Sequence, residues 1–195
     1  IWKRASSMSA AKTSSRFGNN FCMSRLAKKP ISVGKTAVSV AGGTLTVKGT
    51  KATLTKRVHP TIDIQVAPEG VMITPKDASR LAKALTGTFA SHVKNMVQGV
   101  ETPYVKKLIM DGVGYKMEVK GKDVVLTVGF SHTVALPIPE EVSAKVEKNV
   151  MTLESSNKEI LGQFAANVRR VKPPEPYLGK GIHYEGEVIR RKQGK

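Results

Sequence analysis

Two short stretches decide the fold: FASHVK at residues 89–94 and FAANVR at residues 164–169. Their apolar positions match, and they lie 75 residues apart. Each belongs to a segment in which apolar residues recur every three or four positions, which is the spacing of a helix with one buried face. The sequence therefore predicts two similar amphipathic helices, one in each half of the chain.

Both helices are preceded by residues that are typical of a helix start. Thr74 offers a capping hydroxyl three residues before the carboxylate of Asp77, with a proline between them at the first helical position. Ser156 offers the same kind of cap three residues before Glu159. Because a hydroxyl and a carboxylate at this spacing can satisfy the first backbone N–H groups of a helix, we expect the helices to begin there.

A second repeated feature lies upstream of each helix. The triplet VKG occurs at residues 47–49 and again at residues 119–121, and each glycine is followed five residues later by leucine and threonine, at Leu54 and Leu126. Apolar and polar residues alternate on both sides of each triplet, as in strands joined by a glycine-containing turn. Two similar hairpins are predicted, and their agreement with the helices in order and spacing indicates an internal duplication.

These repeats predict an α+β protein made of two tandem copies of a small unit, in which β-sheets and one long α-helix pack around a single core. We place an N-terminal repeat domain at residues 23–101 and a C-terminal repeat domain at residues 102–195, with the linker marked by Gly99 and Pro103. Residues 1–22 are basic, rich in serine and lack a hydrophobic period, which predicts a disordered basic extension. A transit peptide, or a true start at Met23, are alternatives for this segment.

The charge of the chain is large and unevenly distributed. Its 195 residues include 32 Lys and Arg but 15 Asp and Glu, which gives a net charge of +17. Residues 1–62 contain no acidic residue, residues 63–164 contain twelve of each sign, and the remaining excess follows residue 164. Because charge of one sign gathers at both ends, we expect a polyanionic partner, either nucleic acid or an anionic lipid surface.

Catalytic and membrane patterns are incomplete or missing. The longest apolar runs fall short of the roughly 18 residues of a membrane helix, and the single cysteine, Cys22, excludes an internal disulfide. The four histidines have no metal-ligand spacing. The stretch GFSH at residues 129–132 lacks the second glycine of a nucleophile elbow, and VGKT at residues 33–36 lacks the first glycine of a P-loop. We therefore expect no enzyme activity, cofactor, metal, membrane or small-molecule substrate, the alternative being a degenerate nucleotide site at Lys35 and Thr36.

The segment PEPYLGKGIHY at residues 174–184 has the chemistry of an RNA-docking loop. Prolines stiffen it, and glycines on both sides of Lys180 let the backbone approach a phosphate closely. Tyr177, His183 and Tyr184 could stack on bases or ribose. A structural alternative is a proline-stiffened turn that leads into an edge strand, with Tyr184 in the core. Three further cations, Arg190 to Lys192, follow this strand.

The segment at residues 174–184 resembles the signature of the bacterial-type large-ribosomal-subunit protein six family. The stretch MSRLAKKPI at residues 23–31 is similar to that family's opening, and the likeness continues to Lys195. The chain departs from the family at Leu178 and His183, where basic residues are common. The resemblance implies a non-catalytic, structural constituent of the large ribosomal subunit, a ribonucleoprotein particle of translation, either in the bacterial cytoplasm or in an organellar ribosome.

The resemblance also implies partners and binding residues. The expected partners are large-subunit rRNA near the sarcin-ricin region and the stalk base, where the protein would support the translation-factor binding site, and neighbouring ribosomal proteins. The rRNA-binding residues implied are Tyr177, Gly179, Lys180, Gly181, Arg190, Arg191 and Lys192. By charge alone we add Arg169, Arg170 and Lys172. The alternative function is a general nucleic-acid-binding chaperone outside the ribosome, which would bind duplex DNA and unrelated RNA equally well.

Overall fold

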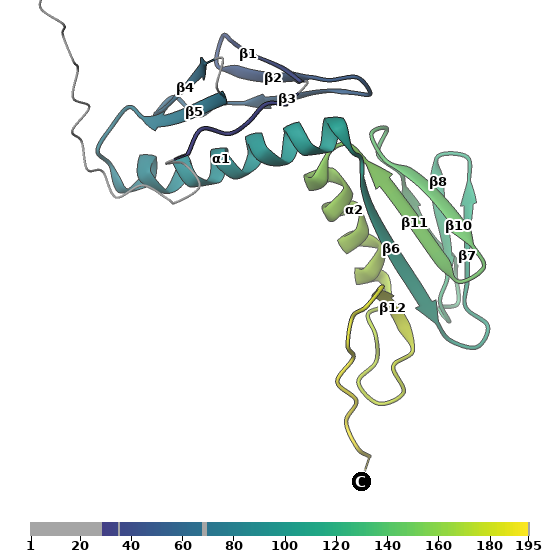
Figure 1. The fold of residues 1–195 in the computed structure, drawn as a ribbon. Coiled ribbons are helices and arrows are strands. Elements are labelled where there is room, and N and C mark those ends of the chain that lie inside the picture. The colour runs from purple at the N-terminus through teal and green to yellow at the C-terminus, as the bar shows by residue number, and fades with distance from the viewer. Residues whose placement is uncertain (1–28, 35, 68–69, 195) are drawn as a thin grey trace, which may run out of the picture.

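The computed structural model describes residues 29–34, 36–67 and 70–194. It contains two units, each with strands and one helix, and the molecule is bent where they meet (Figure 1). One buried hydrophobic cluster draws on residues 45–100 and another on residues 108–182. The predicted α+β fold with a repeated unit and one core per copy is therefore confirmed. The extension predicted at residues 1–22 lies outside the described residues.

The first unit has two antiparallel sheets that share one helix. Strands β1, β2 and β3 form one sheet in chain order, and β4 pairs with β5 in a second. Helix α1 packs against both sheets because its buried residues recur at intervals of one to four positions from Ala82 to Val100. The elements are β1 (Ala37–Ala41), β2 (Thr44–Lys48), β3 (Thr53–Arg57), β4 (Ile62–Ala67), β5 (Gly70–Pro75) and α1 (Arg80–Glu101).

The second unit repeats this plan and adds a final strand. Strands β7, β8 and β9 form one sheet, and the other has the order β10-β11-β6-β12. Helix α2 covers the second sheet through Leu161, Phe164 and Val168, which are buried with the sheet's apolar residues. The elements are β6 (Tyr104–Asp111), β7 (Lys116–Lys120), β8 (Asp123–Thr127), β9 (Val134–Pro137), β10 (Ser143–Glu147), β11 (Val150–Ser155), α2 (Lys158–Val171) and β12 (Gly181–Tyr184).

Both predicted hairpins form, but their registers differ. In the first hairpin Leu54 pairs with Val47, whereas in the second Leu126 pairs with Met117. The difference arises because residues 49–52 connect β2 to β3, while only residues 121–122 connect β7 to β8. Equal spacing in the sequence therefore hides two turns of different length.

The predicted start of the first helix is wrong by five residues. Helix α1 begins at Arg80, and its cap is Ser79, whose Oγ accepts a hydrogen bond of 3.1 Å from the N–H of Ala82. Thr74 instead lies in β5, where it pairs with Asp63 of β4. The strand ladder uses the backbone groups that a helix start at Thr74 would need, so tertiary pairing overrides the local capping signal.

The second helix begins one residue later than the sequence predicted. Its cap is Asn157, whose Oδ1 accepts a hydrogen bond of 3.1 Å from the N–H of Glu159. Glu159 lies in the first turn, where the partial positive charge of the helix N-terminus favours a carboxylate.

The two units meet where the end of α1 passes the start of α2. A Cβ atom at Gly99 would lie 2.1 Å from the carbonyl oxygen of Ser156 and 2.9 Å from the ring of Tyr104. Only glycine allows the two backbones to approach this closely. Because α1 ends at Glu101 and β6 begins at Tyr104, very little chain connects the units. The boundary expected between residues 101 and 102 stays a prediction.

Candidate nucleic-acid interface

The loop between α2 and β12 is closed by its own backbone hydrogen bonds. The N–H of Gly179 donates to the carbonyl of Glu175, and the N–H of Glu175 donates to the carbonyl of Lys180, each at 2.9 Å. Gly179 and Gly181 have φ angles of +78° and +142°, in the region that glycine adopts readily. A Cβ at Gly181 would also lie 2.6 Å from the carbonyl oxygen of Pro173. The loop itself therefore requires both glycines that the sequence analysis selected.

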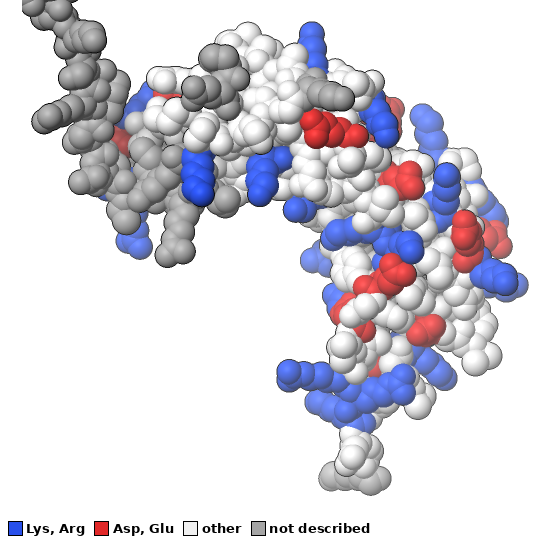
Figure 2. All heavy atoms as spheres, in the orientation of Figure 1, with Lys and Arg blue, Asp and Glu red and all other residues white. Residues whose placement is uncertain are grey.

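The C-terminal tail folds back onto this loop. The N–H of Lys192 donates a hydrogen bond of 2.8 Å to the carbonyl of Pro176. The guanidinium of Arg191 covers Gly179, so closely that a Cβ there would lie 3.4 Å from its Nε and Nη2 atoms. Loop and tail, which the sequence presented as separate basic elements, form one surface. Figure 2 shows Lys and Arg side chains gathered at this end of the molecule.

Most of the predicted binding residues on this surface face solvent. Lys180, Arg190, Arg191 and Lys192 are all exposed, and Tyr177 is 55% exposed beside them. We call this composite of residues 173–181 and 190–192 the loop–tail surface. Its exposed cations and aromatic ring, on a backbone held by internal hydrogen bonds, suit the recognition of phosphates and unpaired bases.

The three residues selected by charge alone have different surroundings. Arg169 is half-buried; its Nη2 lies 2.5 Å from Glu187 Oε1, and its guanidinium lies over the ring of Tyr184 at 5.5 Å. Lys172 is half-buried with its Nζ 5.4 Å from the ring centre of Phe130. Arg170 is exposed. Arg169 therefore binds the start of the tail to the domain, and Arg170 is the most accessible of the three.

Glu187 is the carboxylate that holds the tail in place. Its Oε2 accepts a hydrogen bond of 3.1 Å from the N–H of Tyr184. This hydrogen bond is the largest influence on the pKa of Glu187; partial burial opposes it, and Arg169 adds to it, so the pKa lies below its usual value. The carboxylate is therefore charged at neutral pH. Sequence reasoning missed this role, because a carboxylate in a basic segment gives no local signal.

The two departures from the family signature lie in different environments. Leu178 is 62% exposed at the tip of the loop. His183 is buried in β12, and its Nδ1 lies 4.0 Å from Oδ2 of Asp111. His183 is therefore part of the domain's packing rather than of the exposed loop–tail surface.

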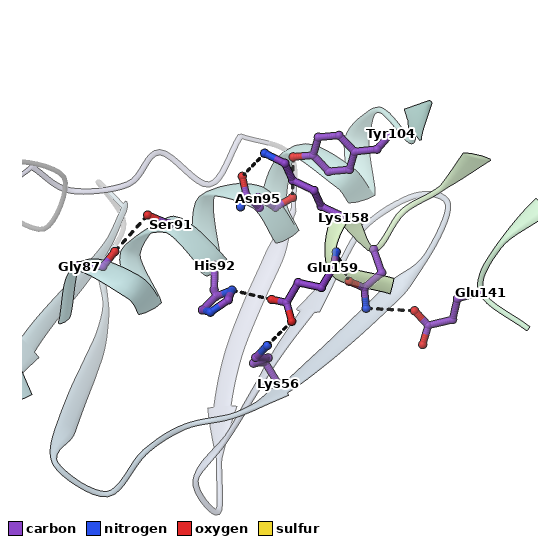
Figure 3. A network of polar contacts seen from close by, with 10 residues as sticks. Lys56, Gly87, Ser91, His92, Asn95, Tyr104, Glu141, Lys158 and Glu159 are labelled. Carbon is purple, nitrogen blue, oxygen red and sulfur yellow. Dashed lines mark hydrogen bonds and ion pairs between the residues drawn. The ribbon is translucent and has the colours of Figure 1, made fainter. Parts of the chain in front are cut away.

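A second polar cluster, which sequence reasoning also missed, joins the two units. Glu159 of α2 reaches Lys56 of β3, with 2.5 Å between Nζ and Oε2, and His92 of α1, with 2.6 Å between Nδ1 and Oε1 (Figure 3). Beside it, Lys158 Nζ lies 3.4 Å from Asn95 Oδ1 and 5.4 Å from the ring centre of Tyr104. We call these six residues the junction cluster.

Glu159 is negatively charged at neutral pH. Partial burial by itself would raise the pKa of Glu159, but the hydrogen bond from Lys56 and the charge of His92 outweigh it and lower the pKa below its usual value. Its side chain is still 50% exposed, so water screens these interactions. The cluster aligns the two units rather than forming a buried reactive site.

The other sites considered from the sequence gain no support. The Thr36 hydroxyl donates a hydrogen bond of 2.6 Å to the carbonyl of Val33, while Lys35 and Cys22 lie outside the described residues. Within the described part of the chain, no group of His, Cys, Asp and Glu side chains could hold a metal ion. In the same residues, no helix is both long and apolar enough to cross a membrane.

Comparison with known proteins identifies the family to which the chain belongs. The family model of ribosomal protein L6 matches residues 33–102 and again residues 112–185. The chain belongs to the ribosomal protein L6 family. The first range covers the first unit, and the second covers the second unit except for β6, so the same family model matches both copies and the duplication predicted from the sequence is confirmed.

Curated relatives agree with this L6 assignment. The chain is 44% identical to the large ribosomal subunit protein uL6 of Desulfosudis oleivorans over 174 residues, covering 89% of this chain and 99% of the relative. It is 45% identical to the protein of the same name from Desulfatibacillum aliphaticivorans over 175 residues, covering 89% and 98%. The uL6 protein of Microcystis aeruginosa is 43% identical over 175 residues, covering 89% and 93%. These relatives, each named as a protein of the large ribosomal subunit, agree with the membership of this chain in the L6 family.

Proposed function

We propose that this L6 protein binds large-subunit rRNA through its loop–tail surface, near the sarcin-ricin region and the base of the stalk. There it would brace the translation-factor binding site beside neighbouring ribosomal proteins, in the bacterial cytoplasm and without catalytic activity. The observation that carries the proposal is the folding of the tail onto the loop. The contacts of Lys192 with Pro176 and of Arg191 with Gly179 hold exposed cations in a fixed arrangement.

Two physical effects make this surface suited to RNA. Its cations neutralise phosphates and release condensed counterions, which favours binding and makes it sensitive to salt. The closed loop and the pinned tail also lose little conformational freedom on binding, because Glu187 and the backbone hydrogen bonds already order them. If about six phosphates are neutralised, the logarithm of the affinity should fall with the logarithm of salt concentration with a slope of about −4 to −5.

The substitution Lys180→Glu tests the loop directly. We expect it to weaken binding of the full chain to a cognate large-subunit rRNA fragment by about 1–3 kcal/mol, because a charged contact is lost and a repulsive one replaces it. Filter binding or calorimetry would measure this. Lys51→Glu makes the same change of charge at an exposed residue of the first unit and should alter affinity far less. If the Lys180→Glu variant and the parent bind with equal affinity, the loop is not part of the RNA interface.

The general nucleic-acid chaperone is the alternative that the net charge of +17 favours. Competition separates the two functions. An L6 protein on its cognate rRNA should resist displacement by an excess of duplex DNA or unrelated RNA, since charge alone does not fix sequence or shape. Displacement by cognate rRNA, duplex DNA and unrelated RNA at the same concentration would support the chaperone.

A further inference from the structure

Two aromatic rings outside the loop–tail surface lie parallel at the surface of the second unit. Phe130 and His132 belong to the stretch between β8 and β9, just after Gly129, whose φ of +76° turns the chain. Their ring planes differ by 15°, and their ring centres are 6.1 Å apart. The pair lies in the GFSH stretch at residues 129–132, which is no complete nucleophile elbow, and outside the loop–tail surface.

The two rings have the geometry of a stacked aromatic pair. Ring centres 6.1 Å apart with planes that differ by 15° fall within the range of stacked aromatic pairs in proteins. Both residues are exposed, so the pair is open to solvent. A third planar group can add to such a surface with offset stacking geometry.

Phe130 is more exposed than the other phenylalanines in the part of the chain that the structure describes. Its side chain is 43% exposed, whereas Phe89 and Phe164 in the two cores are 7% and 4% exposed. Burial of apolar surface is what makes a phenylalanine stabilising in a fold. Phe130 gives up part of this stabilisation, and with His132 and Lys172 beside it the exposed ring joins an aromatic and cationic group at the surface.

The ring pair borders the loop–tail surface. Lys172 Nζ lies 5.4 Å from the ring centre of Phe130, and Lys172 is the C-cap residue that follows α2 and precedes the loop. The carbonyl of Lys172 accepts a hydrogen bond of 2.8 Å from the N–H of Ile182 on the far side of the loop. Lys172 therefore connects the loop–tail surface to the ring pair.

We propose that Phe130 and His132 form a stacking platform for an unpaired base of the bound rRNA, with Lys172 beside it to contact the adjoining phosphate. This rests on the proposed binding of rRNA to the loop–tail surface and adds a second point of contact, of different chemistry. Aromatic side chains stack on bases without regard to their sequence. The platform would therefore recognise an unstacked nucleotide, such as one in a bulge or an internal loop.

The test compares Phe130→Leu with Phe130→Tyr in the full chain, with a cognate large-subunit rRNA fragment as the probe. Phe130→Leu keeps an apolar side chain but removes the ring, and we expect it to weaken binding roughly 5- to 150-fold. Phe130→Tyr keeps the ring and should retain the parent's affinity. Because neither variant changes a charge, the salt slope should be the same in both. Val113→Ala alters a side chain that is 94% exposed in another loop and should have no effect.

The outcomes separate this proposal from the one on which it rests. Unchanged affinity of Phe130→Leu, together with weakened binding of Lys180→Glu, would overturn the platform and leave the loop–tail surface in place. If Lys180→Glu has no effect on binding, the proposed binding of rRNA to the loop is overturned instead. Thermal melting of each variant provides the structural control. Loss of binding by Phe130→Leu that only accompanies a loss of folded protein would also overturn the platform, since the ring would then serve the fold.

Discussion

The two units of this L6 protein share a hairpin and a helix but differ in the segment after the helix. Helix α1 spans 22 residues and is followed almost at once by β6, whereas α2 spans 14 residues and is followed by the loop, β12 and the tail. The extra turns of α1 supply contacts to the second unit through Asn95 and Gly99. One copy has thus been adapted to join the units, and the other to present a cationic surface, on the same scaffold.

Two carboxylates of the second unit hold the start of the tail. In the second unit, Glu185 pairs with Lys107 at 3.4 Å and Glu187 pairs with Arg169 at 2.5 Å. Both carboxylates follow β12 and connect the start of the tail to the domain. The loop–tail surface itself contains one exposed carboxylate, Glu175, but its four exposed cations outnumber this charge, so the surface is basic.

The largest expected effects come from the two cores, which test whether the units are separate. Leu161→Ala and Leu45→Ala each remove a fully buried side chain, one per unit. Each should lower the free energy of unfolding of its own unit by about 2–5 kcal/mol. Native-state hydrogen exchange would locate the loss. Reduced protection confined to the mutated unit would show that the two units unfold separately. Equal loss of protection in both units would mean that the molecule unfolds as one body.

Two carboxylates, one at the tail and one in the junction cluster, should have smaller effects on the free energy of unfolding, and these effects should depend on pH. At pH 7, Glu187→Gln should cost about 1–2 kcal/mol of unfolding free energy, because charged hydrogen bonds are lost. Glu159→Gln should cost less than about 1 kcal/mol, because that side chain is half exposed. Urea denaturation would measure both values.

The sign of the pH effect comes from the lowered pKa of each group. The stabilisation by Glu187 and Glu159 is complete above their ordinary pKa and is lost as the pH falls through the lower pKa of the folded state. The difference between each Gln variant and the parent should therefore shrink in acid below about pH 4. A difference that stays constant from pH 7 to pH 3 would show that the carboxylate charge has no part in holding tail or junction.

The repeated fold could be predicted because its signals are local. Helical spacing around Phe89 and Phe164 and alternation around residues 47–49 and 119–121 each specify an element within a few residues. The start of α1 could not be predicted, since Thr74 has a capping pattern but its backbone pairs with Asp63 in a ladder. Where local preference and tertiary pairing conflict, pairing decides.

The site was predictable in its composition but not in its arrangement. Prolines, glycines and Lys180 mark the loop in the sequence, and the cations of the tail stand out by charge. The packing of Arg191 over Gly179 depends on two bends of the chain that no periodic pattern specifies. The contact between Lys56 and Glu159 spans 103 positions and was equally invisible.

The salt dependence of rRNA binding tests the central claim most directly, namely that one end of the molecule carries the RNA contacts. Two triple variants of the full chain remove three exposed cations each: Arg190→Ala, Arg191→Ala and Lys192→Ala in the tail, and Lys48→Ala, Lys51→Ala and Arg57→Ala in the first unit. Our account predicts that the tail variant reduces the steepness of the salt slope by about 2–3, at about 0.7–0.9 per phosphate contact, and that the other variant leaves it unchanged. Equal reductions in both variants would contradict it, because the RNA would then respond to net charge rather than to the loop–tail surface.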